Sequence, residues 1–425
     1  MSIRNNLKDF FQEMNTLLTS SEFIEQHRVN NSAFSRTRKL AFTDIIHFLL
    51  TLPQKSLSVS LGEFFENMNL PFNKVSKQAF SKARQKIESN ALKHLFSLTT
   101  DIDRFYNDIK TWRGYRILAI DGTLIQLPNT PENKDYFGSS LNQFGGVAQA
   151  RSSALYDVLN DLIIDVLFEN RGIGEKPQAE KLISSFIQTE GFKKHKNIII
   201  FDRGYSSRKI YRLFEENEGY FVMRSGQKNG VLKVISQAPL GDHIIEYEWE
   251  KKVSKVRVVK FPLDTGEIET IATNIFSIDF TEDDFKELYF LRWGIETKYK
   301  EIKSTLKIEN FTGDKPVCVE QDFYANMLIS NICSVIKSET DEIIKEDLVE
   351  KNSKANYQTN RRLLIYRVVR KIITLIESSK DWIYIYNDLI YEIQKCRSQI
   401  RRNRKYERQM TRNRRKYHKN SKPTL

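Results

Sequence analysis

Cysteine, proline and glycine are all scarce in this 425-residue sequence, which contains 3 Cys, 9 Pro and 17 Gly. The low proline and glycine content excludes collagen-like and low-complexity chains. The cysteines, Cys318, Cys333 and Cys396, are an odd number and lack the spacing of a metal-binding motif. They therefore predict buried or inert thiols in a reducing compartment.

The sequence also lacks an apolar run long enough to span a membrane. Its most apolar window, residues 323–336, includes Asn326, Ser330 and Asn331, and it is shorter than the roughly 20 residues that a spanning helix needs. The first residues, Met-Ser-Ile-Arg-Asn-Asn, do not resemble a secretory signal. Because the sequence predicts neither a membrane span nor a secretory signal, we expect a cytoplasmic protein. Its 40% hydrophobic residues predict a substantial core.

Positive charge, in contrast, is concentrated at one end of the chain. The formal net charge is +13, and residues 395–425 contain 13 Lys and Arg against the single acid Glu407. The first 394 residues are therefore nearly neutral. A terminal basic block of this kind is typical of an arm that binds nucleic acid. A solvated tail and contact with an anionic membrane surface are the alternatives.

The hydrophobic pattern predicts a mixed α/β (α+β) chain of two to three domains with helical ends. Residues 1–110 are expected to form an N-terminal helical DNA-binding domain. Residues 111–225 and 276–340 alternate strand and helix patterns, and we expect them to form two parts of one α/β core. Between them, residues 226–275 predict a β-rich insertion with strands at 231–235, 243–249, 253–261 and 269–274. Residues 341–425 are expected to be helical and to end in the basic tail.

One N-terminal helix, expected at residues 76–87, is basic: it carries Lys77, Lys82, Arg84 and Lys86. A basic helix in a small helical bundle favours a contact with DNA, for which Arg84 is a candidate. A solvated surface helix fits the same pattern equally well.

Two aspartates share one local context. Asp121 follows the apolar run 115–120, Asp202 follows the apolar run 197–201, and a glycine comes within two residues of each. The carboxyl ends of strands in an α/β sheet open the crevice in which such sheets bind ligands. Two carboxylates there could share hard divalent cations, which prefer oxygen ligands. Turn formation alone also explains an aspartate and a glycine at a strand end, if either aspartate is taken singly.

A third candidate set lies on one long helix, expected at residues 281–306. Tyr289, Arg292, Glu296 and Lys303 fall within roughly a 60° arc of that helix at about 100° per residue. Glu296 could ligate a metal, while the two cations and the phenol could hold phosphate oxygens. The alternative is a charged helix with ion pairs such as Glu296 to Lys300. His195 and His243 are further acid–base candidates, but hydrolysis by a metal-bound hydroxide needs neither.

Taken in order, these motifs resemble the insertion-sequence family-four transposases, cut-and-paste DDE enzymes with a YREK signature. The resemblance rests on Ile120-Asp121-Gly122-Thr123 with Leu127-Pro128-Asn129-Thr130, on Phe201-Asp202-Arg203-Gly204-Tyr205-Ser206, and on the row Tyr289, Arg292, Glu296 and Lys303. Residues 80–86, 309–313 and 320–324 match as well, so that the likeness covers most of residues 30–340. The chain departs from many relatives at Gly204, where they carry an acidic residue.

The resemblance implies an RNase H-like catalytic core with a β insertion before the glutamate. It implies that Asp121, Asp202 and Glu296 are catalytic and hold two Mg²⁺ ions, with Mn²⁺ as a substitute and Asp121 bridging the pair. The substrates would be double-stranded DNA, both the terminal inverted repeats of the element and the target. A homodimer in a synaptic complex, a hairpin step and a bacterial, nucleoid-associated location are implied too.

The same resemblance supplies the remaining DNA contacts. Tyr289, Arg292, Lys303 and Arg203 would contact the DNA, and Trp249 in the insertion would stack on a displaced base. Trp293, beside the signature, is a second candidate for stacking, and a structural role is the alternative for both tryptophans.

Two other functions remain open at this point. An RNase H-like nuclease without strand transfer would use the same carboxylates, and a catalytically silent, transposase-derived DNA-binding protein would keep the fold without the chemistry. An RNA-binding scaffold would leave the three carboxylates unexplained.

Overall fold

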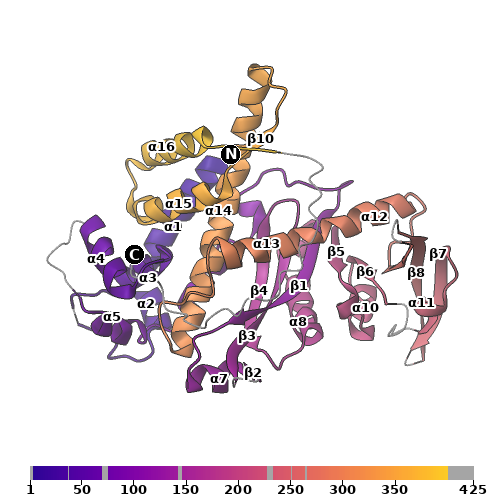
Figure 1. The fold of residues 1–425 in the computed structure, drawn as a ribbon, viewed down its shortest axis with the longest axis horizontal. Coiled ribbons are helices and arrows are strands. Elements are labelled where there is room, and N and C mark those ends of the chain that lie inside the picture. Colours follow the sequence, from indigo (N-terminus) through magenta and orange to yellow (C-terminus); the bar gives the residue numbers. More distant parts are fainter. Residues whose placement is uncertain are drawn as a thin grey trace.

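The computed structural model describes residues 3–400 except for residue 37 and residues 69–74, 142–145, 227–232, 250 and 264–265. The described chain forms a central mixed sheet with helices on both faces and helical segments at both ends (Figure 1). This arrangement confirms the mixed α/β class. Most of the basic tail, residues 401–425, lies outside the described residues.

The central sheet has nine strands in the order β2-β3-β1-β5-β6-β9-β8-β7, with β4 paired to β3. β1 runs antiparallel to β3 but parallel to β5, and β5 runs parallel to β6. The strands are β1 (Arg116–Gln126), β2 (Ser139–Ser140), β3 (Val147–Asp157), β4 (Leu162–Asn170), β5 (Asn197–Phe201), β6 (Tyr220–Arg224), β7 (Gly241–Trp249), β8 (Lys252–Pro262) and β9 (Ile268–Thr273).

The β-rich insertion continues the central sheet. β9 pairs antiparallel with β6, and β8 and β7 extend the sheet beyond it. The strand expected at 231–235 is wrong: residues 231–232 lie outside the described residues, and a short helix, α11 (Lys233–Gln237), follows them. Periodicity cannot separate strand from helix in so short an apolar run, and Ile235 reaches the core from a single helical turn.

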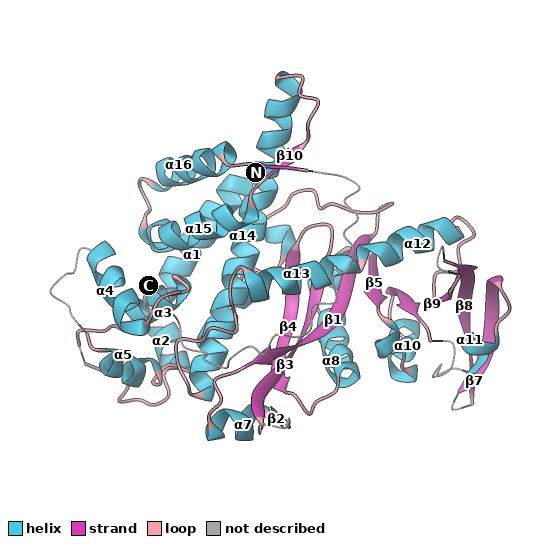
Figure 2. Cartoon of the chain, viewed as in Figure 1, coloured by secondary structure: helices cyan, strands magenta, loops and turns pink. Residues whose placement is uncertain are grey.

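The two faces of the sheet are covered by different helices (Figure 2). Ile198 and Ile200 of β5 pack in a cluster with α12, whereas Ile199 and Phe201 pack with α8 and α10 in the main core. The helices that flank the sheet are α7 (Pro131–Phe137), α8 (Glu175–Ile187), α9 (Glu190–Lys194), α10 (Arg208–Glu215), α12 (Glu282–Leu291) and α13 (Trp293–Ser304). Since successive strand residues point to opposite faces, Asp202 follows Ile200 toward the α12 side.

The single helix expected at 281–306 is divided at Arg292 into α12 and α13. Thr281 caps α12 as its sequence predicts, accepting a hydrogen bond from the backbone N–H of Asp284. At the break, the N–H of Arg292 donates to the carbonyl of Tyr289 at 3.1 Å, and that of Ile295 donates to the carbonyl of Arg292 at 3.2 Å. Each of these hydrogen bonds joins residues three apart, as in the tighter turn of a 3₁₀ helix. The hydrophobic periodicity of the sequence does not reveal such a break.

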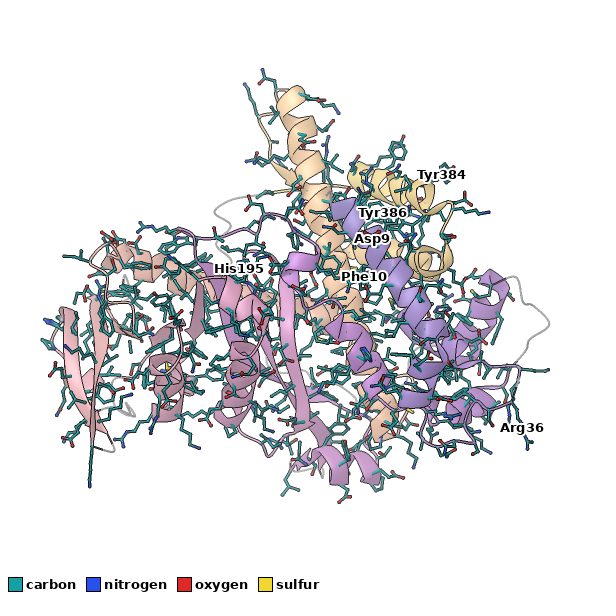
Figure 3. The ribbon with its side chains drawn as sticks, turned by 180° about the vertical axis from the view of Figure 1, so that it is seen from behind. Asp9, Phe10, Arg36, His195, Tyr384 and Tyr386 are labelled. Carbon is teal, nitrogen blue, oxygen red and sulfur yellow. The ribbon has the colours of Figure 1, made fainter. Side chains whose placement is uncertain are left out.

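The two ends of the chain pack on each other. Helices α1–α6 share one core with the helices that follow the sheet, and Phe11 of α1 contacts Trp382 of α16 with 6.1 Å between ring centroids. Figure 3 shows α1, with Phe10 labelled, against the segment that carries Tyr386. These helices are α1 (Ile3–Thr19), α2 (Ser21–His27), α3 (Phe42–Leu50), α4 (Leu57–Asn67), α5 (Lys77–Arg84), α6 (Asn90–Ser97), α14 (Pro316–Glu350), α15 (Arg361–Glu377) and α16 (Trp382–Lys395).

Helix α14 ends at Glu350, 14 residues after the end of the apolar window at residues 323–336. Its first part is buried among the N-terminal helices and β4, and its last part is polar. No helix within the described ranges is long and apolar enough to cross a membrane.

Two buried histidines make the N-terminal helices sensitive to acid. Burial, with a contribution from His94, lowers the pKa of His27 to about 4, and burial lowers the pKa of His47 to about 4. Both stay neutral in the folded chain, whereas in the unfolded chain they take up protons below about pH 6.5. The free energy of unfolding therefore falls as the pH drops from 6.5 toward 4, by up to about 1.4 kcal/mol per pH unit for each histidine.

We expect His47→Leu to make the free energy of unfolding fall less steeply with decreasing pH, by the contribution of one proton. Denaturant unfolding between pH 4.5 and pH 7 measures it. Phe48→Leu, a buried residue of the same helix that does not titrate, is the control for lost packing and should keep the wild-type slope. Identical slopes for wild type and His47→Leu would contradict the assignment.

Candidate active site

Register places three charged residues side by side at one edge of the sheet. Ile120 of β1 pairs with Phe201 of β5, and Phe201 pairs with Met223 of β6. The next residues along these strands are Asp121, Asp202 and Arg224, on parallel strands about 4.8 Å apart. β1 continues through Asp121 to Gln126 with β3 as its partner, so that Asp121 lies within a strand and only Asp202 follows a strand end.

Helices α12 and α13 cross the face of the sheet at this edge. The Tyr289 hydroxyl of α12 donates to Oδ1 of Asp202 at 3.0 Å. The Tyr299 hydroxyl of α13 donates to the backbone carbonyl of Asp121 at 3.0 Å. Further along α13, the Lys303 ammonium donates to Thr123 Oγ1 at 2.6 Å and to a neighbouring carbonyl of β1. Tyr299 and Lys303 therefore register α13 against β1 after Glu296, and Tyr289 holds the preceding helix at Asp202.

Glu296 and Asp121 line one pocket of about 440 Å³, together with Lys300 and Lys303. The guanidinium of Arg292 lies 2.7 Å from Oε1 of Glu296, and its charge also acts on Asp121 and Asp202. Arg292 is 5% exposed. One buried cation is therefore shared by the three carboxylates that the sequence singled out.

The electrostatics of Asp121 indicate a site short of positive charge. The pKa of Asp121 is raised to about 6, mainly by burial; Glu296 and Glu175 add to this rise, and the backbone N–H of Gly122 and the charge of Arg292 oppose it. Glu175, at the start of α8, lies so close that a Cβ at Gly122 would meet its Cγ at 3.0 Å. A cation brought to this pocket would relieve the buried negative charge.

The donor set fits a hard divalent cation, because all three carboxylates offer oxygen ligands. In the described part of the chain, however, no group of three His, Cys, Asp or Glu side chains is arranged to hold one ion. Glu296 is turned toward Arg292 and Asp202 toward Tyr289. The carboxylates are gathered at one edge of the sheet but are held apart by hydrogen-bonding partners.

Arg224 is a candidate site residue that the motif analysis missed. Its Nε lies 2.5 Å from Oε1 of Glu269 on β9, and its guanidinium lies 5.9 Å from the ring centre of Tyr289. Its charge also acts on Asp202. The available signal was its place after the apolar run of β6, which is the same context that identified Asp121 and Asp202.

The DNA contact expected at Arg84 does not fit the structure. Arg84 is 0% exposed. Its guanidinium donates to Gln321 Oε1 at 2.9 Å, to Asp322 Oδ1 at 3.0 Å and to the carbonyl of Cys318 at 3.0 Å, and it also reaches Thr312. The side chain therefore joins α5 to α14 and offers no surface to a phosphate.

The other predicted contacts have different positions. Arg203 is exposed directly beside Asp202, and Trp293 is 44% exposed at the start of α13. The Trp249 side chain lies outside the described residues. His195 precedes β5 and contacts Asp103 at 3.0 Å, at the opposite end of the strand from Asp202 (Figure 3). This position excludes His195 from the chemistry of the carboxylates.

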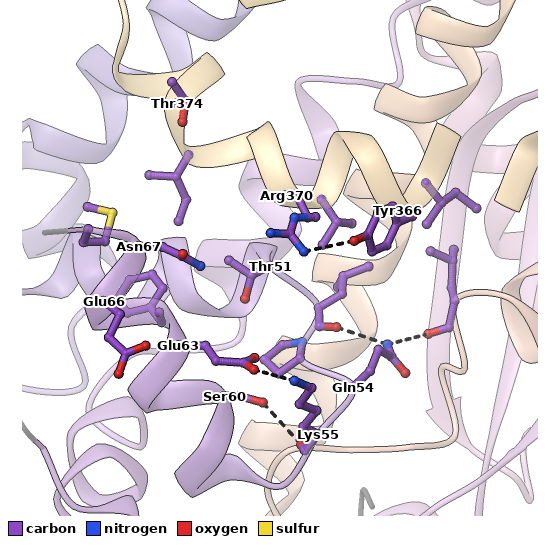
Figure 4. A pocket seen from close by; sticks show the side chains of 18 of the residues that line it. Thr51, Gln54, Lys55, Ser60, Glu63, Glu66, Asn67, Tyr366, Arg370 and Thr374 are labelled. Atoms are coloured by element: carbon purple, nitrogen blue, oxygen red, sulfur yellow. Dashed lines mark hydrogen bonds and ion pairs between the residues drawn. The ribbon is translucent and has the colours of Figure 1, made fainter. Parts of the chain in front are cut away.

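A larger cleft, of about 960 Å³, lies between α4 and α15 and has no carboxylate of the predicted site in its lining (Figure 4). Three cations and three carboxylates line it: Lys55, Arg362, Arg370, Glu63, Glu66 and Glu377. The smaller pocket at Asp121 is the better candidate, because it contains two of the carboxylates that the sequence predicts and its position follows from sheet register.

Gly294 allows α13 to lie against the turn between β3 and β4. A Cβ at this position would meet Val158 Cγ1 at 2.8 Å. Although alanine favours a helix over glycine by about 1 kcal/mol, we expect Gly294→Ala to displace α13 and Glu296 with it. Because a displacement of about 1 Å can cost about a hundredfold in rate, the DNA nicking that the sequence resemblance implies should fall by about ten- to a hundredfold. Val158→Ala added to Gly294→Ala should restore most of the activity, and failure of that rescue would contradict the clash.

Comparison with known proteins defines the class of the chain. Residues 112–332, just over half of the chain, match the family described as "Transposase DDE domain". The chain is 25% identical over 283 residues to the transposase InsG of insertion sequence element IS4 from Escherichia coli (strain K12). That alignment covers 62% of this chain and 61% of the relative, so it spans less than two thirds of the relative's length.

A solved structure, a cryo-EM structure of the piggyBac transposase synaptic complex with hairpin DNA, superposes with a TM-score of 0.44 at 11% identity, over 91% of this chain and 82% of that chain. A likeness at this level is too distant to define the fold. The chain belongs to the transposase DDE domain family. The expected resemblance to the insertion-sequence family-four transposases is confirmed.

Proposed function

We propose that this protein is a transposase that cuts double-stranded DNA at the ends of a mobile element and joins the freed ends to target DNA. The observation that carries the proposal is the site geometry. Asp121 and Asp202 follow paired residues of adjacent parallel strands, and Glu296 lines the same pocket as Asp121. Family membership supports the same conclusion.

The core would be RNase H-like. The order β4-β3-β1-β5-β6, with three antiparallel strands followed by two parallel ones, supports this proposal. We keep residues 1–110 as the proposed helical DNA-binding domain, 111–225 and 276–340 as the two parts of the core, 226–275 as the insertion, and 341–425 as the C-terminal region.

Asp121, Asp202 and Glu296 are the residues that would hold two Mg²⁺ ions, with Mn²⁺ as a substitute. Such ions supply charge neutralisation at the attacking and leaving oxygens of a phosphodiester. To bind an ion together with Asp121, Glu296 must turn away from Arg292, and Asp202 must bind the ion in addition to accepting the hydrogen bond from Tyr289. DNA phosphate could take over Arg292, because a guanidinium binds phosphate oxygens as readily as carboxylates.

The remaining polar groups would position the DNA. Arg292, Tyr289 and Lys303 border the carboxylates, and Arg224 and Arg203 lie beside Asp202. In the proposed sequence, water attacks the phosphorus at the element end and the 3′-oxygen leaves with a proton. In a hairpin step that 3′-hydroxyl attacks a phosphodiester of the opposite strand, and the 3′-oxygen of the flanking DNA leaves with the proton. Water then hydrolyses the hairpin phosphodiester and frees the 3′-hydroxyl again. The freed hydroxyl attacks a phosphodiester of the target, and a 3′-oxygen of the target strand leaves. A base displaced by the hairpin would need a stacking partner such as Trp249 or Trp293.

The test uses the full chain with Mg²⁺ and labelled DNA that carries the inverted repeats flanking its gene. Joined products on a target plasmid, formed by a homodimer that holds two ends, are the expected result. Cleavage without joined products would identify a nuclease. Binding of the ends without cleavage in Mg²⁺ or Mn²⁺ would identify a catalytically silent DNA-binding protein, and either result would overturn the proposal.

A further inference from the structure

A group of four buried or partly buried ionic side chains lies under the helix that carries Glu296. Its members are Lys298 and Glu301 of α13, Asp161 in the turn between β3 and β4, and Arg361, the first residue of α15. None of them belongs to the predicted site. We call this group the α13 ion network.

The network joins α13 to the sheet and to the next helix. The Lys298 ammonium lies 2.9 Å from Oδ1 of Asp161, and it donates to Ser334 Oγ of α14 at 3.0 Å. Lys298 is 4% exposed, and its second acidic neighbour is Glu301 at 3.5 Å. The position of α13 is therefore defined from two sides, by a turn of the sheet and by α14.

Arg361 completes the network from the C-terminal region. Its guanidinium lies 3.1 Å from Oδ2 of Asp161 and 2.8 Å from Oε2 of Glu301, and it donates to Ser334 Oγ at 2.9 Å. One side chain thus spans the turn, α13 and α14. It lies beyond residues 112–332, the part of the chain that matches the transposase DDE domain family.

Attraction between opposite charges keeps Asp161 ionised although it is buried. Burial would raise the pKa of Asp161, but Lys298, Arg361 and a hydrogen bond from Tyr156 hold it well below its usual range. A buried ion pair adds little net stability, because desolvation opposes the attraction, yet losing one partner is costly. What such a network gives is a defined geometry, and here the element it defines is α13.

We propose that Arg361 is a positioning residue for the catalytic helix: through Asp161 and Glu301 it holds α13 where Glu296 shares a pocket with Asp121. The proposal rests on the proposed function, since it assigns Glu296 to catalysis. Gly294 against Val158 and Tyr299 against the Asp121 carbonyl show that α13 packs closely on the sheet, so that a shift of the helix would disturb the contacts around Glu296.

The test compares Arg361→Gln with Arg367→Gln. Both arginines are on α15, but Arg367 pairs with Glu392 of α16 and not with α13. Hydrogen exchange of residues 293–304 should become about tenfold faster in Arg361→Gln and stay unchanged in Arg367→Gln. The Mg²⁺ concentration for half-maximal nicking should rise by up to about tenfold in Arg361→Gln, with DNA affinity unchanged. A direct partner of a metal ligand is worth about 10- to 100-fold, and Arg361 acts through α13 without touching Glu296.

Arg361→Lys keeps the charge, so it should recover part of both effects. If Arg361→Gln fails to fold, Asp161→Asn is measured in its place, since it removes one charge and keeps the shape. Unchanged exchange in residues 293–304, or equally faster exchange throughout the chain, would overturn the positioning role. Wild-type protein that does not nick DNA would overturn the proposed function instead, and hydrogen exchange would still decide the role of Arg361.

Discussion

Glu296→Gln is expected to reduce Mg²⁺-dependent nicking of element ends about a thousandfold, with DNA affinity within about twofold of wild type. The amide keeps the size of the side chain but cannot supply the negative charge that a metal ligand needs. Loss of a ligand costs several kcal/mol of transition-state stabilisation, and about 4 kcal/mol corresponds to that factor. Arg292 keeps Asp121 and Asp202 as neighbours, so the fold should persist.

The measurement pairs single-turnover nicking of a labelled element end with DNA binding by gel shift. Glu282→Gln is the matched control, because Glu282 lies on the first turn of α12 and pairs with Lys286 at the surface. The control should nick at the wild-type rate. Equal losses of nicking and binding in Glu296→Gln would mean that Glu296 supports the DNA-binding surface or the fold and does not act in the chemistry.

Arg84→Met is expected to lower the free energy of unfolding by about 3–5 kcal/mol, the cost of leaving a buried partner without its counter-charge. Burial and the opposing charge of Asp322 define the environment of Arg84, and the charge of Asp322 raises the pKa of the guanidinium. The substitution leaves Asp322, 7% exposed, with only Thr312 to donate to its oxygens among the partners described.

Denaturant titration measures this loss, and Lys82→Met supplies the control from the exposed side of α5. The control should change stability by less than about 0.5 kcal/mol. If Arg84→Met instead keeps its stability and loses only DNA affinity, the side chain contacts DNA, as its basic helix first suggested.

Much of the fold could be predicted because its signals are local. The continuous apolar run of β5 and the cap at Thr281 depend on neighbours in sequence, and both appear where their residues predict them. The prediction of a strand at 231–235 was wrong, because an apolar run of that length is too short for its hydrophobic periodicity to distinguish a strand from a helix. The break at Arg292 needed the actual hydrogen bonds of α12 and α13.

The candidate site was only partly predictable. Spacing along the chain placed Glu296 with Tyr289 and Arg292, and the structure keeps these residues at one edge of the sheet. Arg224 was missed because its closeness to Asp202 depends on β6 lying beside β5, which is a property of strand order. Arg84 was misjudged because charge on a helix does not reveal which face is buried.

The sequence by itself determined the class of fold, the strands that lead to Asp121 and Asp202, and the helical row that contains Glu296. Each of these is encoded in residues close together along the chain, where periodicity and capping act. Only the tertiary structure decided that the insertion extends the sheet, that Arg84 is buried, and that Arg361 reaches α13 from 65 positions after Glu296. Those outcomes depend on which segments, far apart along the chain, pack against each other. Burial and ion pairing are decided only by that packing.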